Sequence, residues 1–317
     1  MKKLFYAVVA LSLFATSCAK SDAPEAKQEM KTITLSVVSP EMQTRAEFSA
    51  GSGTLATTLY YAFYSEWGEY LADVSKPEGI TWNPLTGIKI PVSFIPGRAY
   101  KAVFWADAKM YEVDLEKDFA GLTIDTGYCP VGNEEGYDAF WATVEIDLTE
   151  KGDYEHKPVI LTRPFAQLNI GVPVTDLEEA EKVGVIVGGV GAGVDSAPTV
   201  FSLATGKATD EMNIGIDLAA AGTETITIDG VEYVILSTNY LLVGAEKCLV
   251  DVDFTMCESD EGGDYVDRFF TNIPLQRNHR TFILGNILTE GGEMEYFIKV
   301  DPSFKGDTFV DENGNEL

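Results

Sequence analysis

Residues 248–257, Cys-Leu-Val-Asp-Val-Asp-Phe-Thr-Met-Cys, carry the clearest structural pattern in the chain. Every second residue from Cys248 to Met256 is apolar, and three of the four residues between them are polar. Alternation with a period of two places one set of side chains on a core and the other in water, as in antiparallel sheets. The stretch therefore predicts a β-strand with one buried face.

The same alternation, or a run of β-branched and aromatic residues, recurs along most of the chain. The stretches that show it are 33–38, 88–94, 100–106, 144–148, 165–173, 231–235 and 296–300. Turn signals such as Pro96-Gly97 and Asp229-Gly230 separate them. Helical pattern is confined to 115–119 and 175–182. Many short strands with little helix predict an all-β fold made of antiparallel β-sandwiches.

The start of the chain has the composition of a signal peptide. Two lysines precede the apolar run 4–15, and Thr-Ser-Cys follows it at 16–18. Cys18 resembles the cysteine of the bacterial lipobox, where signal peptidase cuts before a diacylated cysteine. The apolar run is too short to span a bilayer as a helix, which needs about 20 residues. We therefore expect removal of 1–17 and an exported mature protein that is tethered through lipid on Cys18.

The chain is strongly acidic. Its 317 residues include 23 Lys and Arg against 50 Asp and Glu, which gives a formal net charge of −27. This charge makes nucleic acid and anionic lipid headgroups poor partners. Surface carboxylates are expected to keep the exported protein soluble. Hydrophobic residues make up 45% of the chain, which is enough to form buried cores.

The length suits two domains of ordinary size. Residues 18–31 are mostly small or polar and are expected to form a flexible leash. An N-terminal β-sandwich is expected over 32–160 and a C-terminal β-sandwich over 161–317. The boundary is placed between 158 and 172, where a polar turn precedes a strong strand pattern.

Three stretches begin like cofactor or metal sites without completing them. Residues 185–193 are rich in glycine but lack the spacing and the following helix of a dinucleotide loop, so a loop or strand-edge bulge is expected. The tail 311–316 begins like a calcium loop but has Glu316 where that loop needs glycine. Asp251 and Asp253 share one face of a predicted strand, as exposed acids often do in an acidic chain. We expect no cofactor and no metal.

Few side chains suggest catalysis. Apart from the cysteine expected to carry lipid, Cys129, Cys248 and Cys257 remain, and this odd number favours free or buried thiols over a disulfide framework. His156 and His279 are the only histidines, and no nucleophile motif accompanies them. We expect structural histidines and no enzyme; a hydrolase on a β-sandwich is the remaining alternative.

Aromatic residues cluster between 60 and 70, and Trp82, Trp105 and Trp141 follow. We expect most of them in the core, because large sandwiches need such side chains. The alternative is a surface lipoprotein that binds carbohydrate through exposed aromatic rings.

Three stretches resemble the fimbrillin superfamily of Bacteroidetes, which comprises subunits of type V pili and related surface lipoproteins. The first is the lipobox with its leash and the segment Thr44-Arg45-Ala46. The second is 161–170, which is similar to the family's Arg-x-x-Ala-x-Leu/Val strand. The third is 278–289, in which Arg-Thr leads to Gly-Asn-Ile-Leu-Thr as in the family's penultimate strand.

This resemblance implies two transthyretin-like β-sandwich domains and a structural or adhesive subunit of a fimbria. Its partners would be other pilus subunits and surface ligands of the host or of bacteria. In that family an arginine-specific protease removes the first strand, and a strand from another subunit fills the groove. Arg45 and Ala46 flank the corresponding candidate cleavage site here, and the strand 33–38 would be released. The alternative is that Arg45 is an ordinary loop arginine.

Two further features bear on assembly and modification. The C-terminal residues 304–317 have few apolar side chains and two glycines, so they form a weak donor strand. Asp195-Ser196-Ala197 resembles the sites that Bacteroidetes O-glycosylate on exported proteins. Ser196 is therefore a candidate glycosylation site, and we expect it in a loop.

Overall fold

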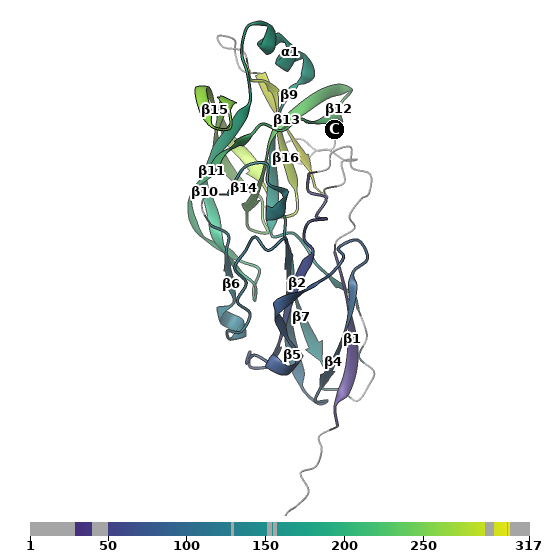
Figure 1. Ribbon diagram of the computed structural model, residues 1–317. Coiled ribbons are helices and arrows are strands. Elements are labelled where there is room, and N and C mark those ends of the chain that lie inside the picture. The colour runs from purple at the N-terminus through teal and green to yellow at the C-terminus, as the bar shows by residue number, and fades with distance from the viewer. Residues whose placement is uncertain are drawn as a thin grey trace, which may run out of the picture.

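The computed structural model describes residues 29–39, 50–127, 130–150, 154, 157–288, 295–302 and 304. Figure 1 shows an elongated molecule with two β-rich halves, and helix α1 (Val174–Lys182) lies at the end opposite to the start of β1 (Lys31–Val38). Within the described residues the elements are almost all strands, and most neighbours are antiparallel. The predicted all-β sandwich fold is therefore confirmed.

The N-terminal half contains two sheets. The first has the order β4-β1-β8, with β4 at Ile88–Phe94 and β8 at Val159–Ile160. The second has the order β3-β2-β5-β7, with strands Lys76–Thr81, Thr58–Ser65, Ala99–Asp107 and Phe140–Asp147. A core of buried residues from both sheets lies between them. Short 3-10 turns occupy Ala72–Val74, Phe119–Gly121 and Glu135–Tyr137.

The C-terminal half also contains two sheets around one core. One has the order β11-β10-β14-β15, with strands Ala208–Ala220, Gly189–Ser202, Cys248–Ser259 and Gly262–Leu275. The other has the order β12-β13-β9-β16-β17, with strands Glu224–Ile228, Val231–Leu242, Phe165–Pro173, Arg280–Asn286 and Glu295–Asp301. Strand β6 (Thr123–Asp125) precedes the expected domain boundary in sequence but pairs with β10, so backbone hydrogen bonds cross it.

A third core joins the two halves. Strand β2 is buried on both faces, so Leu59, Tyr61 and Phe63 enter the N-terminal core. Its other face packs in a cluster that also contains Phe165 and Tyr240 from the C-terminal half. This shared apolar layer fixes the two halves against each other.

Most strand predictions are confirmed. The alternating stretch 248–257 lies in β14, and Val250, Val252, Phe254 and Met256 are buried. The helix predicted at 175–182 is α1. The helix predicted at 115–119 is wrong, because the Asp114 carboxylate accepts the backbone N–H of Glu116 and forms a turn instead.

The glycine-rich stretch is not a loop throughout. Gly189–Gly193 lies in β10, between β11 and β14, with a bulge after Val190. A Cβ atom at Gly189 would lie 2.3 Å from the carbonyl oxygen of Ser259. Glycine is therefore required there by close approach of two backbones.

Candidate functional site

Strand β1 is an integral part of the N-terminal core. Ile33, Leu35 and Val37 are at most 2% exposed and pack between the two sheets. The residues between them point away from this core, as the alternation predicted. Removal of β1 would therefore expose apolar side chains of both sheets.

The two edges of β1 are held very differently. It pairs antiparallel with β4 over seven positions, from Lys31 to Val37. It pairs parallel with β8 over only two, Val37 and Val38. Within the part of the chain that the structure describes, β1 is thus held by one long ladder and by its buried face.

The predicted site residues divide between described and undescribed parts of the chain. Cys18, Arg45 and Ala46 lie outside the described residues, so lipidation and cleavage stay predictions. Ser196 is exposed, but it lies in β10 rather than in the expected loop. A bulge between Val194 and Ala197 lifts it out of the ladder, and its φ of 57° is left-handed.

The backbone that follows the candidate cleavage site is held by three side chains. Arg163 Nη2 donates to the carbonyl oxygen of Gly51 at 2.5 Å, and Arg280 Nη2 donates to that of Ala50 at 2.8 Å. Glu135 Oε2 accepts the N–H of Gly51 at 2.7 Å. The chain is therefore clamped five to six residues beyond Arg45.

These side chains belong to a largely buried group of polar side chains and one aromatic ring, which we call the clamp cluster. Its members come from both halves of the molecule and are Glu135, Asp138, Arg163, Gln167, Tyr240, Arg280, Asp301 and Phe304. Arg163 Nε lies 2.8 Å from Asp138 Oδ1, and Arg280 Nη1 lies 3.6 Å from Asp301 Oδ2. The ring of Phe304 lies against both guanidinium groups. Its centroid is 4.1 Å from Arg163 Cζ and 4.7 Å from Arg280 Cζ.

Gly51 is required by this packing. Its φ is 77°, and a Cβ atom there would lie 2.8 Å from the Phe304 ring and 2.9 Å from Gln167 Nε2. Phe304, an apolar residue of the weak C-terminal donor, is itself buried here. The sequence patterns gave no sign of this cluster, although Arg163 and Arg280 are the arginines of the two strand motifs.

Glu135 is the titratable centre of the cluster. Its Oε2 also accepts the hydroxyl of Tyr240 at 2.9 Å, and that hydroxyl accepts Gln167 Nε2 at 2.9 Å. Burial raises the pKa of Glu135 to about 7, and the negative charge of Asp138 adds to the effect.

We predict that Glu135 makes stability depend on pH in a definite direction. Because its folded pKa is about 7 and its ordinary value is 4.5, the folded protein keeps a proton that the unfolded chain releases between these values. The contribution of Glu135 is therefore greatest below pH 4.5 and is lost as pH rises through 7. Urea unfolding at several pH values should show that Glu135→Gln removes this fall, which is roughly 3 kcal/mol.

The exposed Glu112 provides the matched control. Glu112→Gln should leave the pH profile of the unfolding free energy like that of the wild type. Identical profiles for Glu135→Gln and the wild type would contradict the buried, proton-holding role of Glu135.

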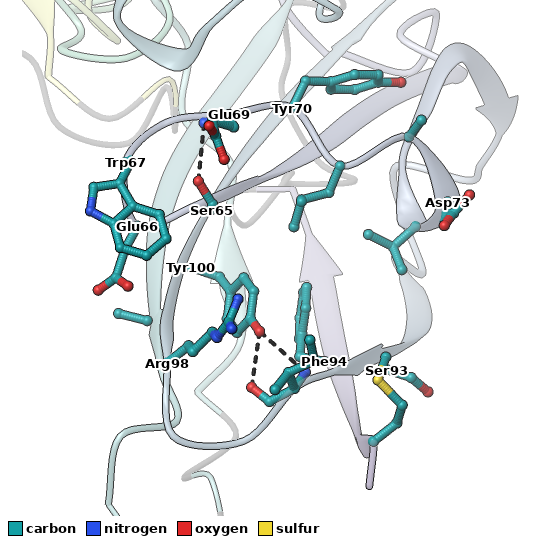
Figure 2. A pocket seen from close by; sticks show the side chains of 16 residues that line it. Ser65, Glu66, Trp67, Glu69, Tyr70, Asp73, Ser93, Phe94, Arg98 and Tyr100 are labelled. Atoms are coloured by element: carbon teal, nitrogen blue, oxygen red, sulfur yellow. Dashed lines mark hydrogen bonds between the residues drawn. The ribbon is translucent and has the colours of Figure 1, made fainter. Parts of the chain in front are cut away.

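A second feature lies at the start of β1. A groove of about 450 Å³ is lined by Met30, by residues between 65 and 74, and by residues between 93 and 100. Figure 2 shows Trp67 and Glu66 at one side, Asp73 at the other, and Tyr100 with Arg98 between them. We call it the Trp67 groove.

The aromatic residues divide as expected between core and surface. Most are buried, namely Tyr60, Tyr61, Phe63, Tyr64, Trp82 and Trp105. Tyr70 and Trp141 are half-buried, and Trp67 is 73% exposed. Core placement is therefore right for most of the cluster, and its exposed ring is that of Trp67.

The other reactive side chains have structural contacts. His279 Nδ1 lies 2.7 Å from the carbonyl oxygen of Arg277, and His156 lies outside the described residues. Cys248 and Cys257 are free thiols, as expected, and Cys129 lies outside the described residues. Within the described ranges, no three His, Cys, Asp or Glu side chains are grouped so that they could hold a metal ion. Those ranges also contain no helix long and apolar enough to cross a membrane.

Several solved structures are similar to this chain over most of its length. A candidate cell adhesion protein from Bacteroides uniformis is 15% identical, with 85% of this chain and 98% of that chain covered and a TM-score of 0.47. A candidate adhesin from Bacteroides thetaiotaomicron is 10% identical, with 89% and 97% covered and a TM-score of 0.48. The fimbrial anchor protein Mfa2 from Porphyromonas gingivalis is 10% identical, with 90% and 98% covered and a TM-score of 0.38.

Two of these structures are thus described as adhesion proteins and the third as a fimbrial anchor protein. A search of curated proteins finds none that matches this sequence. One family model, described as a family of unknown function (DUF6562), matches residues 27–317, and the chain belongs to that family.

Proposed function

We propose that this protein is a structural or adhesive subunit of a cell-surface fimbria. In this proposal it is exported as a lipoprotein, anchored to the outer membrane through Cys18, and assembled with other subunits by strand exchange after cleavage at Arg45. The work is mechanical, and no catalysis is assigned. The observation that carries the proposal is that β1 completes the core yet has a long ladder on one edge only.

Cleavage after Arg45 would separate β1 from the rest of the chain. Loss of β1 would leave the backbone N–H and C=O groups of β4 unpaired and bare the apolar faces of Ile90, Val92 and Phe94. Such a groove fits a strand with the same alternation of apolar and polar residues. A strand of another subunit would satisfy both the ladder and the core.

The clamp cluster supports the same sequence of events. Ala50 and Gly51 are tied to Glu135, Arg163 and Arg280 independently of β1. The chain would therefore stay anchored from Ala50 onward when the preceding segment leaves. Structures of similar fold are described as adhesion and fimbrial anchor proteins, and the proposal assigns this chain work of that kind.

The proposal predicts a change of oligomeric state on cleavage. Purified protein from residue 19 onward should be monomeric, and an arginine-specific protease should cut it after Arg45, as mass spectrometry of the fragments would show. Light scattering should then detect oligomers, because the exposed groove recruits strands from other copies.

Arg45→Ala is the matched variant, and it should remain uncut at this position and monomeric. Clean cleavage after Arg45 with no change in mass, and with β1 still bound, would count against strand exchange.

A further inference from the structure

We propose that the Trp67 groove binds an uncharged glycan, with a sugar ring stacked on the Trp67 indole. This proposal names a ligand class for the adhesive role proposed above. Binding in the groove does not depend on cleavage or strand exchange. The groove volume of about 450 Å³ lies within the range of small-ligand sites.

Trp67 presents its side chain to solvent. It is exposed, and within the described residues its ring packs in none of the buried clusters. A bare indole at the edge of a groove offers a flat apolar face that suits the C–H face of a sugar ring. An indole with no core to fill is thus placed where a ligand can cover it.

The turn that carries Trp67 is fixed in place by hydrogen bonds. The N–H of Gly68 donates to Ser65 O at 2.9 Å, and the N–H of Glu69 donates to Ser65 Oγ at 3.2 Å. On the far side, Gly68 O accepts the N–H of Phe119 at 2.9 Å. The indole is therefore held on a supported turn, which lowers the entropy lost on binding.

The groove has an apolar floor with polar groups around it. Leu71, Val74 and Phe94 line the groove, and the Phe94 ring stacks on that of Tyr100 at 4.3 Å. The hydroxyl of Tyr100 is already engaged, since it donates to Ile95 O at 2.9 Å and accepts Ile95 N–H at 3.1 Å (Figure 2). The floor is therefore rigid and largely apolar.

The rim supplies groups that hydroxyls can bind. Glu66, Glu69 and Asp73 offer acceptors, and Arg98 offers donors. Among the described residues, no two of these four side chains form an ion pair with each other. Sugar hydroxyls both donate and accept, so they match this mixed rim.

The charge of the rim selects among glycans. Three carboxylates against one guanidinium leave the groove negative, within a chain whose net charge is −27. Sialylated, sulfated and uronic-acid glycans would be repelled. Neutral sugars meet no such repulsion.

The test uses the full mature chain, uncut. An array of neutral, sialylated and sulfated glycans, with a lysine-rich peptide added as a separate probe, should show binding to neutral glycans only. Titration calorimetry with the best neutral glycan should then show at least a tenfold loss of affinity for Trp67→Ala, with Trp67→Phe retaining more affinity than Trp67→Ala. Glu66→Gln should weaken binding less than Trp67→Ala does.

Phe269→Ala provides the matched control, because Phe269 is also an exposed aromatic residue but lies in β15, outside the groove. It should bind as the wild type does. The proposal is overturned if no neutral glycan binds, if anionic glycans bind better, if the lysine-rich peptide alone binds, or if Trp67→Ala and Phe269→Ala behave alike. None of these results changes the oligomerisation test, so the two proposals fail separately.

Discussion

Replacing Arg163 with alanine is expected to lower the free energy of unfolding by about 3–5 kcal/mol. The reason is that Asp138 is only 2% exposed and would lose a partner that reaches both of its carboxylate oxygens. A buried carboxylate left without its cation keeps the full cost of desolvation. The Gly51 carbonyl would lose its donor, and the ring of Phe304 would lose one of its two cations.

Urea unfolding monitored by circular dichroism would measure this loss. Arg98→Ala is the matched control, because Arg98 is exposed, and it should change stability by no more than about 0.5 kcal/mol. Removing both charges, as in Arg163→Met with Asp138→Leu, should cost less than Arg163→Ala alone. An Arg163→Ala protein as stable as Arg98→Ala would show that the clamp cluster does not hold the two halves together.

The strands were predictable because their signal is local. The alternation in 248–257 needs only neighbours in sequence, and β14 reproduces it. Strand β2 is harder, since it is buried on both faces and shows no alternation. One face of β2 is buried because residues of the C-terminal half, among them Phe165 and Tyr240, cover it. This contact depends on the tertiary fold and leaves no local pattern in the sequence.

The sites were less predictable for the same reason. The clamp cluster joins Gly51 to Arg163 and Arg280, which are far apart in the chain. The sequence motifs marked both arginines as strand signatures but could not show that they meet. Similarly, the sequence did not distinguish Trp67 from its buried aromatic neighbours. Trp67 is exposed because it lies in the turn that ends at Gly68, outside the core.

Loss of β1 is expected to be the most damaging change to the N-terminal half. Burial of an aliphatic side chain contributes about 1.5–3 kcal/mol, so the three inward residues Ile33, Leu35 and Val37 together contribute roughly 5–9 kcal/mol. This is comparable to the whole stability of an ordinary domain, about 5–15 kcal/mol. A protein without β1 should therefore hold a folded N-terminal half only when another strand occupies the groove.

Peptide complementation would test this directly. A protease site placed between residues 40 and 49 would allow β1 to be cut away and then removed in mild urea. The remaining protein should show a lower unfolding midpoint, and excess synthetic peptide of residues 30–39 should restore it. The same peptide with Leu35→Asp should fail, because it would bury an unpaired carboxylate, whereas Thr34→Asp, on the outward face, should succeed. Equal rescue by both peptides, or an unchanged midpoint without any peptide, would mean that β1 is not the exchangeable core strand on which fimbrial assembly is proposed to depend.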